Sequence, residues 1–178
     1  MGSRSSPDND PVAAVTGIVR VLGLDPSVRS TGYGVIECSH GAMHLVEAGV
    51  ITTNGAGTFA QRLGDISASL RSLIAATRPN IIAVEEVFAR AINPRTTIMM
   101  AHARGAMLAA AAEAHLRVFE FSATSVKRSV AGNGAASKEQ VGRMVVQVLR
   151  LARMPRPADV TDALALAIAC AQRGERSR

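Results

Sequence analysis

Two acidic residues each follow directly after an apolar run. Asp25 follows the run at 19–24, and Glu85 follows the run at 81–84. Apolar runs without alternation are typical of strands buried on both faces of a sheet. Sites in open α/β sheets collect at the carboxyl ends of such strands. Either acid alone is better explained as the start of a solvated loop, whereas for the two together a functional pair and two loop ends both remain open.

A second acidic pair opens the last helix that the sequence predicts, at 157–172. Asp159 and Asp162 are three residues apart, which places them about 60° apart around the helix axis and in its first turn. The predicted buried stripe of the helix passes beside them, through Val160 and Leu164. An aspartate in a first turn also complements the helix dipole or caps the helix, so a purely structural role stays open for each.

These four carboxylates stand in a basic chain, which has 20 Lys and Arg against 14 Asp and Glu and a formal net charge of +6. If the fold brings them together, a proton or a cation must relieve their repulsion. Ligand sets made of oxygen alone select hard ions, here Mg²⁺, for which Mn²⁺ can substitute. Two such ions roughly 4 Å apart can activate a water and stabilise the leaving oxygen of a phosphodiester. The charge pattern predicts a metal-dependent nuclease with a basic surface for a polyanion.

Three antiparallel strands are predicted in the first third of the chain. Proline ends the first strand at Asp25-Pro26, and tight turns join the strands, one at 26–30 and one at His40-Gly41. The predicted strands are 19–24, 31–38 and 43–52.

Beyond this meander the apolar period changes from two to 3.6, and helices alternate with strands. The predicted elements are helix 58–77, strand 81–84, helix 95–115, strand 116–121, and helices 123–131, 138–151 and 157–172. The order β-β-β-α-β-α-β-α-α-α predicts an α/β fold with a five-stranded mixed sheet flanked by helices. The helix at 95–115 is apolar almost all round, which fits either burial or an interface.

A chain of 178 residues fits a single domain, and neither a repeat nor a long linker divides it. We expect a flexible extension over 1–18, one domain over 19–172 and a basic tail over 173–178. Two cysteines, no secretory signal and no apolar run of about 20 residues favour a reducing compartment, the cytoplasm, with no membrane association.

Four motifs in order resemble the signatures of the RuvC family of bacterial Holliday junction resolvases. The motifs are LGLDP at 22–26, TGYGV at 31–35, AVEEVF at 83–88 and PADVTDALALA at 157–167, and the segments at 126–127 and 132–138 also match. The likeness covers roughly residues 19–172. It implies a ribonuclease H-like fold, whose mixed sheet starts with three antiparallel strands.

The resemblance also implies roles for individual residues. Asp25, Glu85, Asp159 and Asp162 match the acids that hold the family's metal ions, which implies Mg²⁺ and two ions in each active site. Glu86 points to the opposite face of an extended strand from its neighbour, and the motif has its acid at the earlier position.

Three further residues match DNA-binding positions of the family. Lys127 and Lys138 are the only lysines of the chain, and they match cations near the scissile phosphate. A GC-rich coding bias also explains why every other basic residue is arginine. Phe88 matches an aromatic that stacks on or wedges into bases, and a plain core position is its alternative.

The implied activity is that of a structure-specific endonuclease which resolves Holliday junctions in recombination and DNA repair. It hydrolyses two phosphodiester bonds symmetrically, and two sites related by a twofold axis imply a homodimer. The helix at 95–115 is one candidate for the interface. The resemblance also implies the RuvA–RuvB branch-migration complex as a partner. One departure is Ser27, where family members usually have Gly, so the turn after Asp25 is expected to differ slightly.

Two other functions compete with this interpretation. The turn at 23–32 is also similar to a phosphate-binding turn of actin-like ATPases and sugar kinases, but those proteins need two such domains. A non-catalytic module that binds branched DNA is the second alternative. Four acids in register argue against it, because a pure binder gains nothing from negative charge beneath a phosphate.

Overall fold

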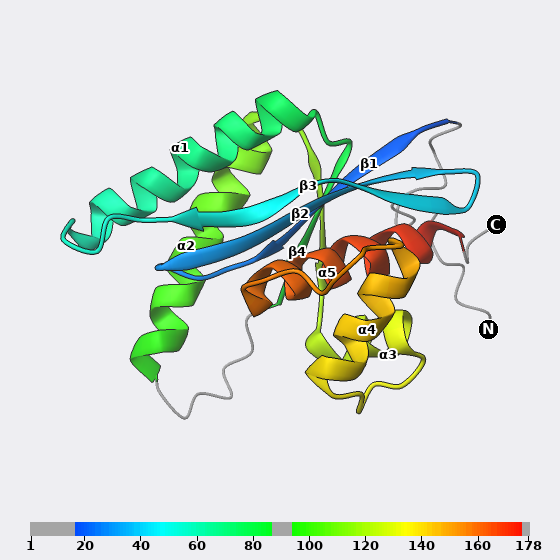
Figure 1. Cartoon of the computed structure of the whole chain (residues 1–178). Coiled ribbons are helices and arrows are strands. Elements are labelled where there is room, and N and C mark those ends of the chain that lie inside the picture. The colour runs from blue at the N-terminus through cyan, green and yellow to red at the C-terminus, as the bar shows by residue number, and fades with distance from the viewer. Residues whose placement is uncertain (1–16, 87–93, 176–178) are drawn as a thin grey trace, which may run out of the picture.

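The computed structural model describes residues 17–86 and 94–175, in which a five-stranded sheet carries helices on both faces (Figure 1). The strands lie in the order β3-β2-β1-β4-β5. β1 pairs antiparallel with β2 and β2 with β3, whereas β4 pairs parallel with β1 and β5 with β4. The predicted mixed sheet is confirmed. The strands are β1 (Val19–Asp25), β2 (Ser30–Ser39), β3 (Ala42–Thr52), β4 (Ile81–Glu85) and β5 (Arg117–Phe121).

The helices of the described ranges agree with the predicted positions within a few residues. They are α1 (Phe59–Thr77), α2 (Pro94–Glu113), α3 (Ala123–Ala131), α4 (Lys138–Val148) and α5 (Ala158–Glu175). α4 ends at Val148 rather than at 151, because Leu149 leaves the helical conformation and Arg150 adopts a left-handed backbone with φ 51°. None of these helices is long and apolar enough to cross a membrane.

β1 sends alternate side chains into two separate core layers. Val21 is buried on the face that α3, α4 and α5 cover, whereas Leu22 and Leu24 are buried on the face that α1 and α2 cover. Figure 1 shows these two helical layers on either side of the sheet. Burial on both faces explains why the run that precedes Asp25 carries so little polar alternation.

α5 packs closely on the sheet because glycines of β1 and β2 face it. A methyl group at Gly23 would overlap the carbonyl oxygen of Ala163, and a methyl group at Gly34 would come within 2.5 Å of Leu164 Cδ2. The helix is buried at almost every position from Val160 to Ala171. Its backbone is therefore fixed directly against the backbone of the sheet.

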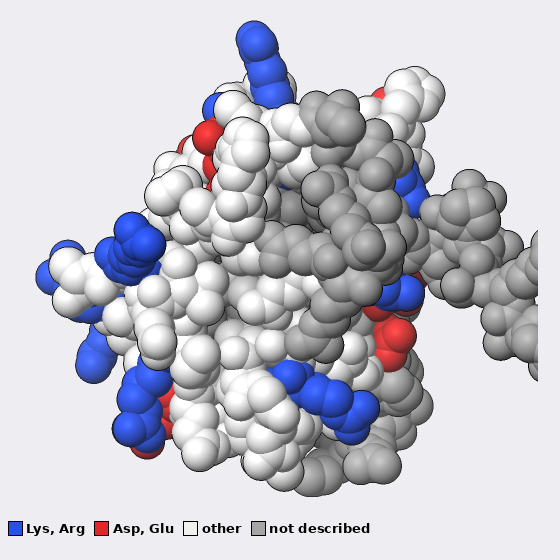
Figure 2. Space-filling model, turned by 90° about the vertical axis from the view of Figure 1, so that its right-hand side faces the viewer, with Lys and Arg blue, Asp and Glu red and all other residues white. Residues whose placement is uncertain are grey.

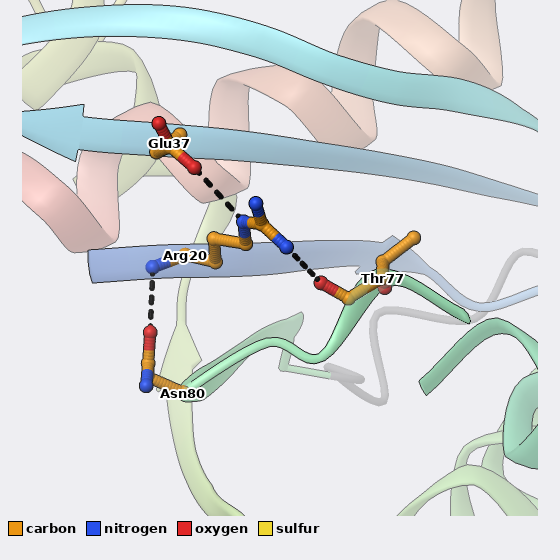
Figure 3. Close-up of polar contacts among 4 residues, drawn as sticks. All are labelled: Arg20, Glu37, Thr77 and Asn80. Carbon is orange, nitrogen blue, oxygen red and sulfur yellow. Dashed lines mark hydrogen bonds and ion pairs between the residues drawn. The ribbon is translucent and has the colours of Figure 1, made fainter. Parts of the chain in front are cut away.

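Arg20 ties several elements together at the amino end of β1 (Figure 3). Its Nε donates a hydrogen bond to Glu37 Oε2 at 2.9 Å, and its guanidinium Nη1 donates to the Thr77 carbonyl oxygen at 3.0 Å. Its backbone N–H donates to Asn80 Oδ1 at 2.8 Å. These bonds connect β1 and β2 with the last residue of α1 and with the segment that precedes β4.

α2 is only partly covered in the single chain. Its buried residues lie from the middle of the helix onward, at Ala103, Met107, Ala110 and Ala111. In the first half Ile98 is 57% exposed. Burial against the core is therefore confirmed for the helix from Ala103 onward, and an interface at its more exposed first half stays a prediction.

Candidate active site at the carboxyl end of the sheet

Asp25 and Glu85 are the last residues of two neighbouring parallel strands. β1 and β4 pair in a register that places Leu24 opposite Val84, so the acid after each lies at the same edge of the sheet. Both acids are half-buried. The sequence prediction that two apolar strands carry their acids to one edge therefore agrees with the structure.

Asp159 reaches this edge through a close contact between α5 and β2. Gly32 lies opposite Asp25 in the β1–β2 pairing, and a methyl group on Gly32 would overlap the carbonyl oxygen of Asp159. The hydroxyl of Ser30 donates a hydrogen bond to Asp159 Oδ2 at 3.3 Å. The first turn of α5 thus lies directly beside the end of β1.

Asp162 follows on the next part of the helix and is paired with a lysine. Lys138 Nζ donates to Asp162 Oδ2 at 2.6 Å. Lys138 is the first residue of α4, and the N-cap Ser137 fixes this end because its side chain accepts a hydrogen bond from the Gln140 N–H. A capped helix end therefore holds an ammonium group against the acidic cluster.

A cavity of about 90 Å³ lies between these elements. Its charged lining consists of Glu85, Asp162, Lys127 and Lys138. The space suffices for several water molecules. Its apolar lining comes from α3, α4 and α5, at Ala123, Val126, Val141, Ala165 and Leu166.

The pKa values of the two acids at the strand ends are raised. Burial, together with repulsion from Glu85, Asp162 and Asp159, raises the pKa of Asp25 to about 7, although Lys138 opposes the rise. The pKa of Glu85 is also raised, first by burial and then by Asp162, against the two lysines. Carboxylates that share one site in this way favour a proton or a cation between them.

The donor set suits a hard divalent ion, since all four predicted ligands are carboxylates. Among the described residues, however, no group of three or more acidic, His or Cys side chains is arranged as the ligands of one metal ion. Asp162 is instead engaged by the ammonium group of Lys138. The acids converge on one edge, and a common coordination sphere requires their side chains to move.

The other candidates differ in how far the structure places them. Lys127 lines the cavity, as stated, whereas Glu86 does not. Phe88 lies outside the described residues. Ser27 does not adopt a positive φ, and its carbonyl oxygen accepts a hydrogen bond from the Thr31 hydroxyl at 2.6 Å. Serine is therefore accommodated in the turn after Asp25.

The sequence analysis missed two residues of the site, Ser30 and Gly32. Ser30 contacts Asp159, and Gly32 permits the approach of the helix. Gly32 belongs to the TGYGV motif that the analysis singled out, so its position was marked although its contact was not. No local pattern indicated Ser30, because its partner is 129 residues away in the chain.

Comparisons with known proteins identify the family. The sequence model of the family described as crossover junction endodeoxyribonuclease RuvC matches residues 21–170. The chain is 44% identical over 156 residues to the RuvC of Nitrosomonas eutropha, covering 88% of this chain and 86% of that one. It is 43% identical to the RuvC of Bordetella avium, covering 88% of this chain and 85% of that one.

Solved structures agree with this assignment. The RuvC structure of Thermus thermophilus superposes with a TM-score of 0.81 at 33% identity, covering 89% of this chain and 97% of that one. The same protein in complex with a Holliday junction substrate gives a TM-score of 0.79 at 34% identity, covering 85% of this chain and 92% of that one. The yeast mitochondrial Holliday junction resolvase, at 15% identity, shares the fold with a TM-score of 0.69. The predicted fold class is confirmed, and the chain belongs to the RuvC family of crossover junction endodeoxyribonucleases.

Proposed function

We propose that this protein resolves Holliday junctions as a magnesium-dependent endonuclease, cutting two phosphodiester bonds symmetrically in recombination and DNA repair. The observation that carries the proposal is the convergence of Asp25, Glu85, Asp159 and Asp162 at one edge of the sheet. It occurs in a member of a family whose Thermus thermophilus relative has been solved with a Holliday junction substrate. Residues 19–172 would form the nuclease domain.

The four acids would hold the divalent ions, two in each site, with Mg²⁺ preferred and Mn²⁺ able to substitute. Such ions, when bound, supply the charge that activates water and stabilises the leaving oxygen. Asp25 and Glu85 lie on rigid strand ends, and the aspartates lie on a helix fixed against the same strands. This scaffold orients the carboxylate oxygens, since strands and packed helices hold side chains more precisely than loops do.

The two lysines would bind the scissile phosphate. Lys127 and Lys138 both line the cavity beside Glu85. Lys138 is 76% exposed in its side chain although its tip contacts Asp162, so it can reach an entering phosphate. An ammonium group there offsets the repulsion between the acids and the DNA backbone. Phe88 would stack on or wedge between bases of the junction.

Symmetric cutting of two strands would require a homodimer with twofold symmetry. The uncovered first half of α2, where Ile98 is 57% exposed, is the surface that we propose for this interface. The RuvA–RuvB branch-migration complex would be a further partner, and the cytoplasm the compartment. The family match spans residues 21–170 and decides against the ATPase alternative.

The experiment is the incubation of the protein with an immobile four-way junction, with and without Mg²⁺, followed by mapping of the cuts. We expect paired, symmetric nicks only with the metal. Asp25→Asn should abolish cleavage while junction binding survives, and Glu86→Gln is the matched control that should cut normally. Binding without any nicking by the parent protein would instead support the non-catalytic alternative, and normal cleavage by Asp25→Asn would refute the proposed site.

A further inference from the structure

Two grooves flank the loop at 149–157, which connects α4 with α5. One has a volume of about 780 Å³, and Lys138 and Asp162 of the candidate site contribute to its lining. The other has a volume of about 720 Å³ and reaches the edge strand β3 at Leu45 and Ala48. Both grooves are lined by the same stretch of the loop, Met154–Arg156, so they meet there. Together they form what we call the loop groove, which runs from the acidic site to the edge of the sheet.

The uncompensated charge of the loop groove is positive. Arg153 and Arg156 line it and are exposed, and neither makes a hydrogen bond or an ion pair through its side chain within the described ranges. The acidic lining residues do have cationic partners. Asp162 pairs with Lys138 at 2.6 Å, and Glu139 lies 3.6 Å from Arg143. A ligand that enters the groove therefore meets two free guanidinium groups.

Arginine recurs at every third position of this segment, since Arg150 precedes the two lining residues and is also exposed. Three residues of chain span at most about 10 Å. Charges on one DNA strand repeat about every 3.4 Å along the helix axis. Neighbouring arginines of the loop can thus contact phosphates one to three nucleotides apart. Basic side chains are not confined to the groove, because Lys and Arg also project from several parts of the right-hand side of the molecule, which Figure 2 shows.

We propose that the loop groove carries the sugar–phosphate backbone of a junction arm as it leaves the cleavage site, with Arg153 and Arg156 as its phosphate contacts. The inference rests on the proposed function and adds a surface to it. Continuity favours DNA over an acidic peptide, because the groove begins at the residues that would hold the scissile phosphate. The apolar walls of the groove, at Leu45, Ala48 and Val160, would lie against the sugars of the DNA backbone, while the arginines contact its phosphates.

The test measures junction binding by Arg153→Gln/Arg156→Gln in an Asp25→Asn background, which prevents cleavage during the titration. The matched control is Arg71→Gln/Arg78→Gln, which removes the same charge from the exposed surface of α1 and its C-cap, on the other face of the sheet. Each protein is titrated with a junction that has long arms and with one whose arms are cut to a few base pairs, over a range of salt concentrations. Thermal melting establishes that every variant is folded.

We expect the loop double variant to bind the long-armed junction about 10-fold more weakly, with a slope of log K against log salt that is smaller by about 2. Binding of the short-armed junction should change much less, and the α1 control should bind like the parent. The charge reversal Arg153→Glu/Arg156→Glu should weaken long-arm binding further.

Equal affinities and equal salt slopes for the loop variant and the parent would overturn the proposal and leave the groove to another partner, such as an acidic peptide. An equal loss in the α1 control would overturn it too, because the effect would then be one of net charge. Failure of the proposed function has a different signature, namely a parent protein that neither binds nor cuts a junction, and the inference falls with it.

Discussion

The charged residues at the two ends of β1 have opposite surroundings. At the amino end, Arg20 has an acidic partner at 2.9 Å and a carbonyl acceptor at 3.0 Å, so its charge is compensated. At the carboxyl end, Asp25 lies near other acids. Burial and the repulsion from these acids raise its pKa to about 7. The charge at the amino end of β1 therefore stabilises the fold, whereas the ionised carboxylate at its carboxyl end destabilises it.

The amino end of β1 thus contributes to stability, whereas its carboxyl end carries the candidate active site. Residues at functional sites are often held in arrangements that cost free energy, which the rest of the structure must offset. Here the hydrogen bonds of Arg20 lie at the opposite end of the strand from the acids. Changes at the two ends should therefore affect activity and stability in opposite ways.

The largest effect should come from Asp25→Asn, assayed on a four-way junction with saturating Mg²⁺. If Asp25 is a metal ligand, as we propose, its loss removes charge stabilisation of several kcal/mol, so cleavage should slow by roughly 10³-fold or more. Quantified product bands against time provide the measurement. Arg20→Gln, assayed well below its melting temperature, should cut at the parent's rate, and a comparable loss in that variant would erase the distinction between the two ends.

Gly32→Ala should be the most destabilising change at the carboxyl end. The added methyl group overlaps the carbonyl oxygen of Asp159, so α5 must shift, at a cost of about 1–3 kcal/mol in the free energy of unfolding. Cleavage should fall as well, because the helix carries two of the acids. Gly64→Ala is the control, since open space surrounds Gly64 on α1, and it should stabilise the protein by up to about 1 kcal/mol. Chemical denaturation of both variants decides the matter, and equal stabilities would contradict the close contact.

Asp25→Asn should also stabilise the metal-free protein, in a pH-dependent way. The folded-state pKa of Asp25 is raised from 3.8 to about 7, so its ionisation opposes folding progressively as the pH rises from about 4 to 7. The gain from the neutral side chain should be fully present above pH 7, at about 1–3 kcal/mol, and should vanish near pH 4. Melting curves in EDTA at several pH values measure it. A gain that is the same at every pH would show that charge repulsion is not the cause.

Arg20→Gln should have the smallest of these effects on the free energy of unfolding, a loss of about 1–2 kcal/mol, because Glu37 and the Thr77 carbonyl lose their partner. Arg71→Gln is its control, since the Arg71–Glu113 pair is exposed at 51% and 60% and should contribute less than about 1 kcal/mol. Urea unfolding separates the two variants. If both lost the same stability, the amino end would hold no special role.

The sequence predicted the parts of the site that depend on local pattern. The uninterrupted apolar runs before Asp25 and Glu85 indicated internal strands, and the structure confirms this. The start of α5 was predicted from its apolar stripe, and Asp159 lies in the first turn as predicted. Asp162 lies in the second turn, because α5 begins at Ala158. The motifs supplied the rest of the candidate set, because each acid falls within or beside a recognisable segment.

What could not be predicted depends on contacts between distant segments. The β1–β2 register sets Gly32 opposite Asp25, and α5 lies against that glycine only in the folded chain. The pair between Lys138 and Asp162 likewise depends on how α4 packs on α5. The end of α4 at Val148 escaped prediction because the apolar period continues past it, whereas a left-handed Arg150 ends the helix.

The glycine contacts beneath α5 have a consequence for how this enzyme tolerates change. The distance of Asp159 from the strand acids is set by contacts between the backbone of α5 and the backbone at Gly23 and Gly32. It does not depend on the size of core side chains. Val, Leu and Ile can therefore replace one another in the two core layers without changing the relative positions of the acids. Homologues can differ widely in their core residues and still keep the same arrangement of acids, provided that both of these positions remain glycine.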